Sequence, residues 1–319
     1  MLEFFLVFLV GLALAVILGV PILKLCKKFH LSQTILHYVD KHAGKSGTPT
    51  MGGWIFIIAS CLASAVFLRG EVYTPILILL TMLGYGILGF LDDFIKIKYH
   101  KNEGLKPYQK IIGQVALALI LAIFAYFNVG SEIDLFGLKL DLGIFIIPFI
   151  VFFYVAVTNA VNLTDGLDGL ATGVSGSYLL FFGIILALLG FPNYSIISFA
   201  LLGSLVGFFL FNCFPAKIFM GDTGSLALGG AIASLAVFSG LELIMPIIGI
   251  LFVLTVISDI LQVGYYKKTH KRIFKMAPLH HHFEQSGVHE NRIVAVYIVI
   301  TIVCGIGTLI GYLFVTGVL

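Results

Sequence analysis

The stretch LEFFLVFLVGLALAVILGVPILKL, residues 2–25, decides the fold. It is apolar almost throughout, and it exceeds the roughly 20 residues of helix that cross the hydrocarbon core of a bilayer. Its hydrophobic residues follow one another without alternation, which favours a helix over a strand of a membrane barrel. The run is longer than the core of a cleavable signal peptide and is followed by Lys27 and Lys28. We therefore expect it to be a first membrane-spanning helix.

The rest of the chain has the same composition as this first segment. Of the 319 residues, 60% are hydrophobic and only 11% are charged, whereas a soluble domain carries roughly 25% charged residues. Peptide groups in lipid must find hydrogen bonds within their own segment, so the apolar runs should be helices. We expect an all-α polytopic membrane protein, with a single integral membrane domain over residues 1–319. The ten expected spans lie near 2–25, 51–68, 74–91, 111–129, 143–160, 170–189, 194–211, 223–239, 244–266 and 293–317.

The basic residues give these spans an orientation. Alternation of the spans places 17 of the 19 basic residues on one side of the membrane, and only Arg69 and Lys139 on the other. The positive-inside rule assigns the richer side to the cytoplasm, so both termini are expected outside. The segment 132–141 alternates around a Phe-Gly turn, which predicts a small periplasmic hairpin. The four cysteines lack metal-ligand spacing, and the three that lie in or near apolar runs are expected to be small core residues.

Acids and histidines gather on the same side as the basic residues. All nine histidines and nine of the 16 acidic residues fall in the loops or span ends assigned to the cytoplasm. Acids contribute little to membrane orientation, so topology alone does not explain their placement. Their gathering indicates a functional site built from several cytoplasmic loops.

The first acidic motif is GFLDDFIKIKYHKNEGLKPYQK, residues 89–110, in which Asp92 and Asp93 sit at the end of the third span. Adjacent helix positions point about 100° apart, so one carboxylate is expected to face a metal or a substrate proton while the other pairs with a lysine. The alternative is a helix end with solvated charges. Against it, acids at a helix C-terminus oppose the helix dipole.

The second motif is TNAVNLTDGLDGLATG, residues 158–173, in a short cytoplasmic turn. Asp165 and Asp168 are three residues apart, and glycines leave backbone amides exposed where the sixth span begins. Free amides at the positive end of a helix suit a phosphate or a nucleotide edge. The alternative is helix capping by Thr164 or Asp165.

The third motif is FNCFPAKIFMGDTGSLALGG, residues 211–230. Asp222 stands at the start of the eighth span, where a lone aspartate would ordinarily act as an N-cap. Asn212, Lys217 and Phe219 share the preceding loop. The aromatic ring is either a membrane anchor or a stacking partner for a base.

Two further cytoplasmic loops carry basic and histidine residues. KMAPLHHHFEQSGVHENR, residues 275–292, contains three consecutive histidines; phosphate contact or local hydrogen bonding is favoured over a zinc site, because adjacent side chains diverge. KHAGKSGTPTMGGW, residues 41–54, places Lys45 among glycines. It lacks the Walker A spacing, but an amide-rich loop with a lysine suits a pyrophosphate. Oxygen ligands with basic residues favour Mg²⁺ over zinc or copper.

Together the motifs resemble the polyprenyl-phosphate N-acetylhexosamine-1-phosphate transferase family. LDD at 91–93, NLTDGLDGL at 162–170 and MGDTGSL at 220–226 carry this resemblance, which covers nearly the whole chain. APLHHHFE at 277–284 is the narrower mark, typical of the phospho-N-acetylmuramoyl-pentapeptide transferases. The resemblance implies that undecaprenyl phosphate attacks the β-phosphate of UDP-MurNAc-pentapeptide, releasing UMP and forming lipid I. It also implies Mg²⁺ dependence, a homodimer, and a cytoplasmic active site in the bacterial inner membrane.

The resemblance also assigns roles to individual residues, with Asp222 as the Mg²⁺ ligand. It implies catalytic roles, at the metal or near the phosphates, for Asp92, Asp93, Asp222, Lys110, His280, His281 and His282. It implies substrate-binding roles for Lys45, Asn162, Asp165, Gly166, Leu167, Asp168, Asn212 and Phe219, the last stacking on uracil.

Several alternatives stay open on the sequence. A lipid phosphate is largely ionised near neutral pH, which favours its direct attack, with Asp92 as base or orienting group, over a two-step route through an aspartyl-phosphate. The substrate alternative is a sister transferase using another UDP-aminosugar such as UDP-GlcNAc. A membrane transporter is disfavoured, because its ionisable groups should lie near the membrane midplane. No nucleic-acid partner is expected.

Overall fold

The computed structural model describes residues 2–29, 31, 47–99 and 104–315. In this described part, nine helices are long and apolar enough to cross a membrane, which confirms an all-α polytopic membrane protein. They are α1 (Leu2–Lys28), α3 (Tyr73–Lys98), α4 (Pro107–Asn128), α5 (Ile146–Thr164), α6 (Leu170–Leu188), α7 (Pro192–Asn212), α8 (Gly221–Ser239), α10 (Ile250–Thr269) and α12 (Glu290–Val315). The predicted span 51–68 corresponds to α2 (Gly53–Phe67), an apolar helix of only 15 residues.

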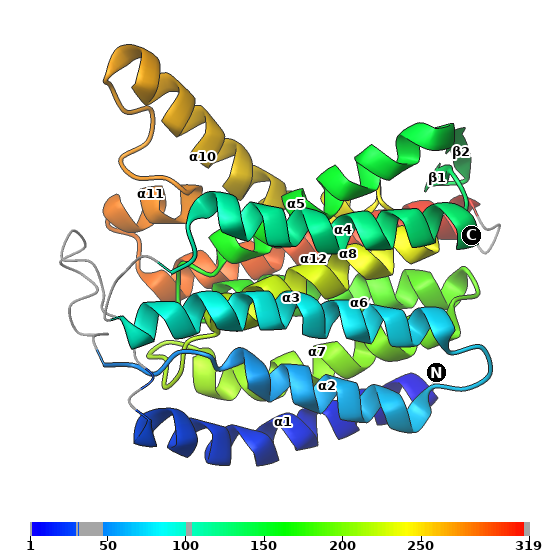
Figure 1. Ribbon diagram of the computed structural model, residues 1–319, viewed down its shortest axis with the longest axis horizontal. Coiled ribbons are helices and arrows are strands. Elements are labelled where there is room, and N and C mark those ends of the chain that lie inside the picture. The colour runs from blue at the N-terminus through cyan, green and yellow to red at the C-terminus, as the bar shows by residue number, and fades with distance from the viewer. Residues whose placement is uncertain (1, 30, 32–46, 100–103, 316–319) are drawn as a thin grey trace.

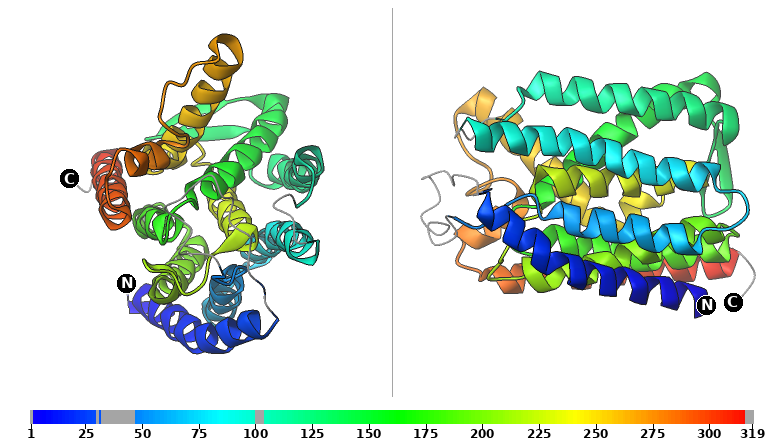
Figure 2. Two further views of the ribbon diagram at one scale, coloured as in Figure 1. Left: turned by 90° about the vertical axis from the view of Figure 1, so that its left-hand side faces the viewer. Right: turned by 60° about the horizontal axis from the view of Figure 1, so that its bottom comes forward.

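The spans lie roughly side by side, and α8 runs through the middle of the bundle (Figure 1). In the view along the bundle, α8 is surrounded by other helices, among them α2, α3 and α5, which pack on it (Figure 2). α8 is accordingly the most completely buried of the spans. The outer helices instead expose apolar side chains such as Ile17 and Ile260, as expected for surfaces that face lipid tails.

Small residues allow the neighbouring helices to approach α8 closely. A Cβ atom added to Gly53 of α2 would lie 2.2 Å from the Cα of Gly224. One added to Gly229 would lie 2.6 Å from the Cα of Thr158 on α5, and one added to Gly230 would meet the ring of Tyr85 on α3. Close backbone contact of this kind substitutes for the hydrophobic effect, which does not drive helices together within a membrane.

The predicted continuous span 244–266 is wrong in one respect, because the helix is broken. A short helix, α9 (Met245–Ile248), ends at Gly249, whose ψ of 32° is not helical, and α10 begins at the next residue. Pro246 favours a helix start at this place, and glycine tolerates the non-helical dihedrals that follow. After the break, α10 leaves the bundle at a steep angle (Figure 1).

The predicted hairpin is present. β1 (Glu132–Leu135) pairs antiparallel with β2 (Leu138–Asp141), and Phe136 and Gly137 form the turn, both with positive φ angles. A turn with two left-handed residues matches the twist of the two strands. The start of α1 and the end of α12 lie at this end of the bundle, and the second and third acidic motifs lie at the opposite end (Figure 1).

Candidate active site

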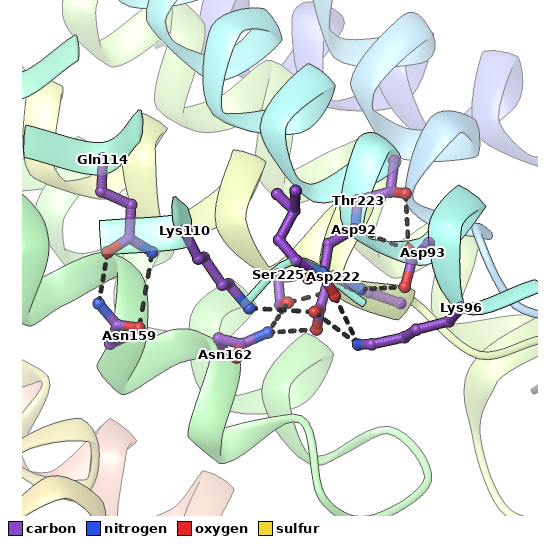
Figure 3. Close-up of polar contacts among 12 residues, drawn as sticks. Asp92, Asp93, Lys96, Lys110, Gln114, Asn159, Asn162, Asp222, Thr223 and Ser225 are labelled. Atoms are coloured by element: carbon purple, nitrogen blue, oxygen red, sulfur yellow. Dashed lines mark hydrogen bonds and ion pairs between the residues drawn. The ribbon is translucent and has the colours of Figure 1, made fainter. Parts of the chain in front are cut away.

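Three carboxylates meet where the end of α3 reaches the beginning of α8. Asp92, Asp93 and Asp222 each offer an oxygen atom, and these atoms lie within 4.8 Å of one another (Figure 3). Two come from the last turns of α3 and one from the first turn of α8. The structure therefore brings together the acids of the first and third motifs.

Asp93 is committed to the start of α8. Its side chain is fully buried, and its carboxylate accepts hydrogen bonds from the amide of Asp222 at 3.2 Å and from the amide and hydroxyl of Thr223 at 2.9 and 2.7 Å. These amides belong to the first turn of a helix and have no partner within it. Asp93 thus caps α8 from a neighbouring helix. Asp222, predicted as a possible N-cap, is the second residue of the helix, because Met220 occupies the cap position.

Asp92 leaves α3 in a different direction from Asp93, as their adjacency in a helix requires, and it has partners of its own. One oxygen forms an ion pair with the ammonium of Lys96, one turn further along α3, at 2.6 Å. The other accepts a hydrogen bond from the amide of Leu105 at 2.8 Å. A Cβ atom on Gly104 would lie 2.6 Å from this second oxygen, so glycine lets the loop pass over the carboxylate.

Asp222 collects donors from three helices. Its Oδ2 atom accepts from Lys96 at 2.9 Å and from Lys110 of α4 at 3.0 Å. Its Oδ1 atom accepts from Asn162 of α5 at 2.7 Å, and the same amide also reaches Ser225 (Figure 3). The positive end of the α8 dipole adds to the stabilisation of this carboxylate.

A glycine on α3 makes this meeting possible. A Cβ atom on Gly89 would lie 2.0 Å from the main-chain oxygen of Asp222, closer than any side chain allows. α3 therefore lies directly against the backbone of α8, three residues before Asp92. Gly89 is the first residue of the first acidic motif, and the close approach of α3 to α8 explains why a glycine stands there.

The turn between α5 and α6 carries the second motif. In the described residues no side chain caps α6; Gly169 occupies the cap position with a φ of 77°. Capping by Thr164 or Asp165, the predicted alternative, does not occur, because Thr164 donates to Ala160 and Asp165 ends α5. Asp168 accepts a hydrogen bond from the amide of Ala216 at 2.9 Å and so joins the turn to the third motif.

A further acid, Asp165, ends α5. Its side chain is half-buried, lies beside the carboxylates already described, and is placed outside the membrane-spanning helices. Burial raises the pKa of the Asp165 carboxyl well above its ordinary value, and the charges of the neighbouring carboxylates raise it further. The neutral form of the Asp165 carboxyl is therefore favoured in the folded protein.

The three histidines lie on a short helix that the sequence did not predict, α11 (Leu279–Gln285). A Cβ atom on Gly166 would lie 2.3 Å from Nε2 of His280 and 3.0 Å from Nε2 of His281, so both rings lie against the second motif. Burial lowers the pKa of His280 well below its ordinary value, and His281 lowers it further. His281 bonds to Glu284 at 2.9 Å, and His282 accepts from the amide of Lys275 at 3.1 Å.

Of the predicted substrate-binding residues, Asn162 touches the carboxylate cluster through Asp222. Asn212 is buried, and its amide bonds to Thr172 at 2.7 Å and to the main chain of Ile218 at 3.1 Å. Phe219 is half-buried, and its main chain pairs with the segment before α2. Leu167 is buried in the core, and Lys45 lies outside the described residues.

The structure adds residues that the sequence analysis did not single out. Lys96 bridges Asp92 and Asp222, and Thr223 completes the cap by Asp93. The spacing of four between Asp92 and Lys96 on one helix was an available signal. For Gln114 and Asn159, which bond to each other inside the bundle, the signal was an amide within an apolar run (Figure 3).

Comparison with known proteins is consistent with this geometry. Residues 75–240 match the model of glycosyl transferase family 4. The chain is 45% identical over 303 residues to a phospho-N-acetylmuramoyl-pentapeptide-transferase of Clostridium botulinum (strain Eklund 17B / Type B), covering 94% of each chain. Proteins of the same name from Clostridium perfringens (strain 13 / Type A) and Thermoanaerobacter sp. (strain X514) are similar at 46% over 297 residues and 50% over 264 residues. These alignments cover 92% and 82% of this chain, and 94% and 83% of the relatives.

Proposed function

The chain belongs to glycosyl transferase family 4 and, within it, to the phospho-N-acetylmuramoyl-pentapeptide transferases. From this premise we propose that it transfers phospho-MurNAc-pentapeptide from UDP-MurNAc-pentapeptide to undecaprenyl phosphate, forming lipid I and UMP in peptidoglycan synthesis. The observation that carries the proposal is the lysine-bridged carboxylate cluster, found in a chain that aligns over nearly its full length with proteins of this name. We place the reaction on the cytoplasmic face of the bacterial cell membrane, because the sequence puts 17 of the 19 basic residues in loops and span ends on the same side as the three carboxylates.

The arrangement suits a reaction between two phosphates. The lipid phosphate attacks the phosphorus bonded to the sugar, a new P–O bond forms, and the bond to UMP breaks. Lys96 and Lys110, both mostly buried at the cluster, supply positive charge for the oxygens that carry the developing charge. Catalysis of phosphoryl transfer depends chiefly on such positioning and charge stabilisation.

Among the three carboxylates, Asp92 is the best placed to receive or orient a proton of the lipid phosphate. Asp93 is fully buried and engaged by the α8 amides, whereas Asp92 pairs with Lys96, accepts one loop amide and contacts the Asp222 carboxylate that would hold the metal. A direct attack needs no strong base, since the lipid phosphate is largely ionised near pH 7. We therefore favour the one-step route over an aspartyl-phosphate intermediate.

The donor set fits Mg²⁺. Three carboxylates face two lysines, so negative charge is in excess. Carboxylate oxygens are the ligands that Mg²⁺ takes in phosphate-binding sites. Asp222 would hold the ion, with Asp92 beside it. When bound, the ion supplies positive charge to the pyrophosphate oxygens and to the leaving phosphate.

The remaining assignments are part of the same proposal. His280 and His281 lie against the second motif, and His282 follows them on the same short helix. We assign all three to contacts near the phosphates of the nucleotide. The substrate-binding residues would be Lys45, Asn162, Asp165, Gly166, Leu167, Asp168, Asn212 and Phe219. Of these, Lys45, Gly166, Leu167, Asn212 and Phe219 would lie on the nucleotide side, and Asp165 and Asp168 would line the same cleft. The proposed assembly is a homodimer.

Transfer assays test the substrate assignment. Purified protein is supplied with undecaprenyl phosphate and either radiolabelled UDP-MurNAc-pentapeptide or radiolabelled UDP-GlcNAc, and lipid-linked product and UMP are measured. We expect product and stoichiometric UMP from UDP-MurNAc-pentapeptide. Product from UDP-GlcNAc alone would assign the chain to a sister activity, and movement of substrate without UMP release would indicate a transporter.

A further inference from the structure

Two amide side chains pair inside the bundle, one helical turn from the carboxylate cluster. Asn159 Nδ2 on α5 donates to Gln114 Oε1 on α4 at 2.8 Å, and Gln114 Nε2 donates to Asn159 Oδ1 at a longer 3.5 Å (Figure 3). Gln114 is fully buried and Asn159 half-buried. A buried amide in a membrane-spanning helix is unfavourable unless its polar atoms are satisfied, and here each amide satisfies the other.

Gln114 and Asn159 each lie one helical turn from a residue that donates a hydrogen bond to Asp222. Gln114 follows Lys110 by four residues on α4, and Asn159 precedes Asn162 by three on α5, so each pair shares a helix face. Lys110 reaches one oxygen of Asp222 and Asn162 reaches the other. The amide pair therefore joins, one turn deeper, the same two helices that hold this carboxylate from both sides.

A third helix is attached at the same point. The hydroxyl of Tyr85 on α3 donates to the main-chain oxygen of Gln114 at 3.1 Å. Tyr85 lies two turns before Asp92 on α3. Gln114 is thus bonded to α5 through its side chain and to α3 through its backbone, and these helices carry the other polar groups of the site.

The hydrogen-bonded pair of Gln114 and Asn159 fixes the axial position of α4 relative to α5, which apolar packing alone does not fix. Around Gln114, α4 is built from alanine, leucine, isoleucine and valine, whose contacts are not directional. A slip of one residue along the helix axis moves a side chain by about 1.5 Å, which is enough to break the 3.0 Å contact of Lys110 with Asp222. Interhelical hydrogen bonds resist such slips where no hydrophobic effect holds helices together.

We propose that Gln114 is a positioning residue: its paired amide with Asn159 fixes α4 against α5 and so holds the Lys110 ammonium on Asp222. The inference rests on the proposed function, because it gives Lys110 its importance for turnover. Gln114 touches neither substrate nor metal and acts only through Lys110.

The test replaces Gln114 and measures how fast the Lys110 amine reacts with a labelling reagent. In Gln114→Leu, the purified protein is treated with an amine-acylating reagent in the absence of substrate, and labelling of each lysine is measured by mass spectrometry. We expect Lys110 to label several-fold faster than in the parent protein, because its ion pair protects it, while exposed Lys98 labels at an unchanged rate. Turnover should fall about tenfold or more, as for other displaced catalytic groups.

Conservative and control variants separate positioning from folding. Gln114→Glu is expected to retain most of the turnover and the protection of Lys110, because a protonated carboxyl has the same acceptor and donor as the amide. Ser198→Ala removes a buried bond between α7 and α6, away from the cluster, and should leave both readouts unchanged. If Gln114→Leu does not fold, Gln114→Met, which keeps the unbranched shape, is judged by the same criteria.

The labelling experiment needs no substrate, so it is independent of the reaction assigned. Unchanged Lys110 labelling in a folded Gln114→Leu protein overturns the positioning role. Equal acceleration at Lys110 and Lys98 also overturns it, because the effect would then be general loosening. Failure of the parent protein to form lipid I, with a selective change at Lys110, would count against the proposed function alone.

Discussion

The carboxylate of Asp93 accepts hydrogen bonds from both the amide and the hydroxyl of Thr223, at 2.9 and 2.7 Å. A side chain of α3 thereby caps the N-terminus of α8, and the amide of Asp222 donates a further hydrogen bond to the same carboxylate. The relationship divides the two adjacent aspartates by task. Asp93 holds the helix that presents Asp222, and Asp92 pairs with Lys96.

Asp93→Ala is therefore expected to destabilise the protein. It leaves buried amides of the first turn of α8 without a partner, and loss of a cap together with an unpaired buried donor costs about 2 kcal/mol or more. Thr223→Val removes only the hydroxyl bond and should cost about 1 kcal/mol. Thermal melting in detergent measures both variants. An Asp93→Ala protein that melts with the parent would show that the cap is dispensable.

Asp222→Ala is expected to abolish turnover while the protein stays folded and extractable. The substitution removes the acceptor shared by Lys96, Lys110 and Asn162, and with it the proposed metal ligand. Transfer is measured across a Mg²⁺ titration, with Asp141→Asn on the exposed hairpin as control. Near-normal activity at saturating Mg²⁺ would remove Asp222 from the metal site.

Gly89→Ala is expected to impair both stability and turnover. The new methyl group would lie 2.0 Å from the main-chain oxygen of Asp222, so α3 and α8 must separate, which costs about 3 kcal/mol. Gly84→Ala is the matched control on the same helix, since its methyl group would meet Leu117 at an ordinary 3.6 Å. Equal melting temperatures for the two variants would contradict the close approach.

The pH dependence of stability is expected to include a contribution from His280. Its pKa is lowered by burial, so between that value and the ordinary 6.5 the unfolded chain binds more protons than the folded chain. Stability should therefore fall as the pH drops below about 6.5 and level off above it. In His280→Leu this slope should diminish, whereas His270→Asn, at an exposed left-handed position, should keep it. Identical slopes in melting temperature against pH would refute the assignment.

Much of the fold follows from hydrophobic length alone. Continuous apolar runs predicted the spans, and the alternation around Phe136 predicted the hairpin. The break at Gly249 escaped prediction because the residues on both sides are apolar, so composition does not distinguish one long helix from two. The short helix α11 escaped because seven residues are too few for a periodic pattern.

The candidate site was predictable as a set of loops, but not as a set of contacts. Topology indicated that Asp92 and Asp222 share one side of the membrane, and the structure brings them together with Asp93. Nothing in the sequence distinguished the cap from the free carboxylate, because that depends on which helix Asp93 meets. The roles of the histidines and of the nucleotide-side residues stay predictions.

The burial of α8 also bears on how the protein is assembled in the membrane. Its mean hydropathy of 1.3 is the lowest among the nine spans of the described chain, against 2.9 for α1. Serine, threonine and aspartate account for this, and neighbouring helices rather than lipid receive them. A newly made α8 is therefore poorly retained by lipid alone and depends on helices synthesised before it, α3 and α5 among them. The helix that carries Asp222 is thus expected to insert stably only after the spans that precede it in the chain.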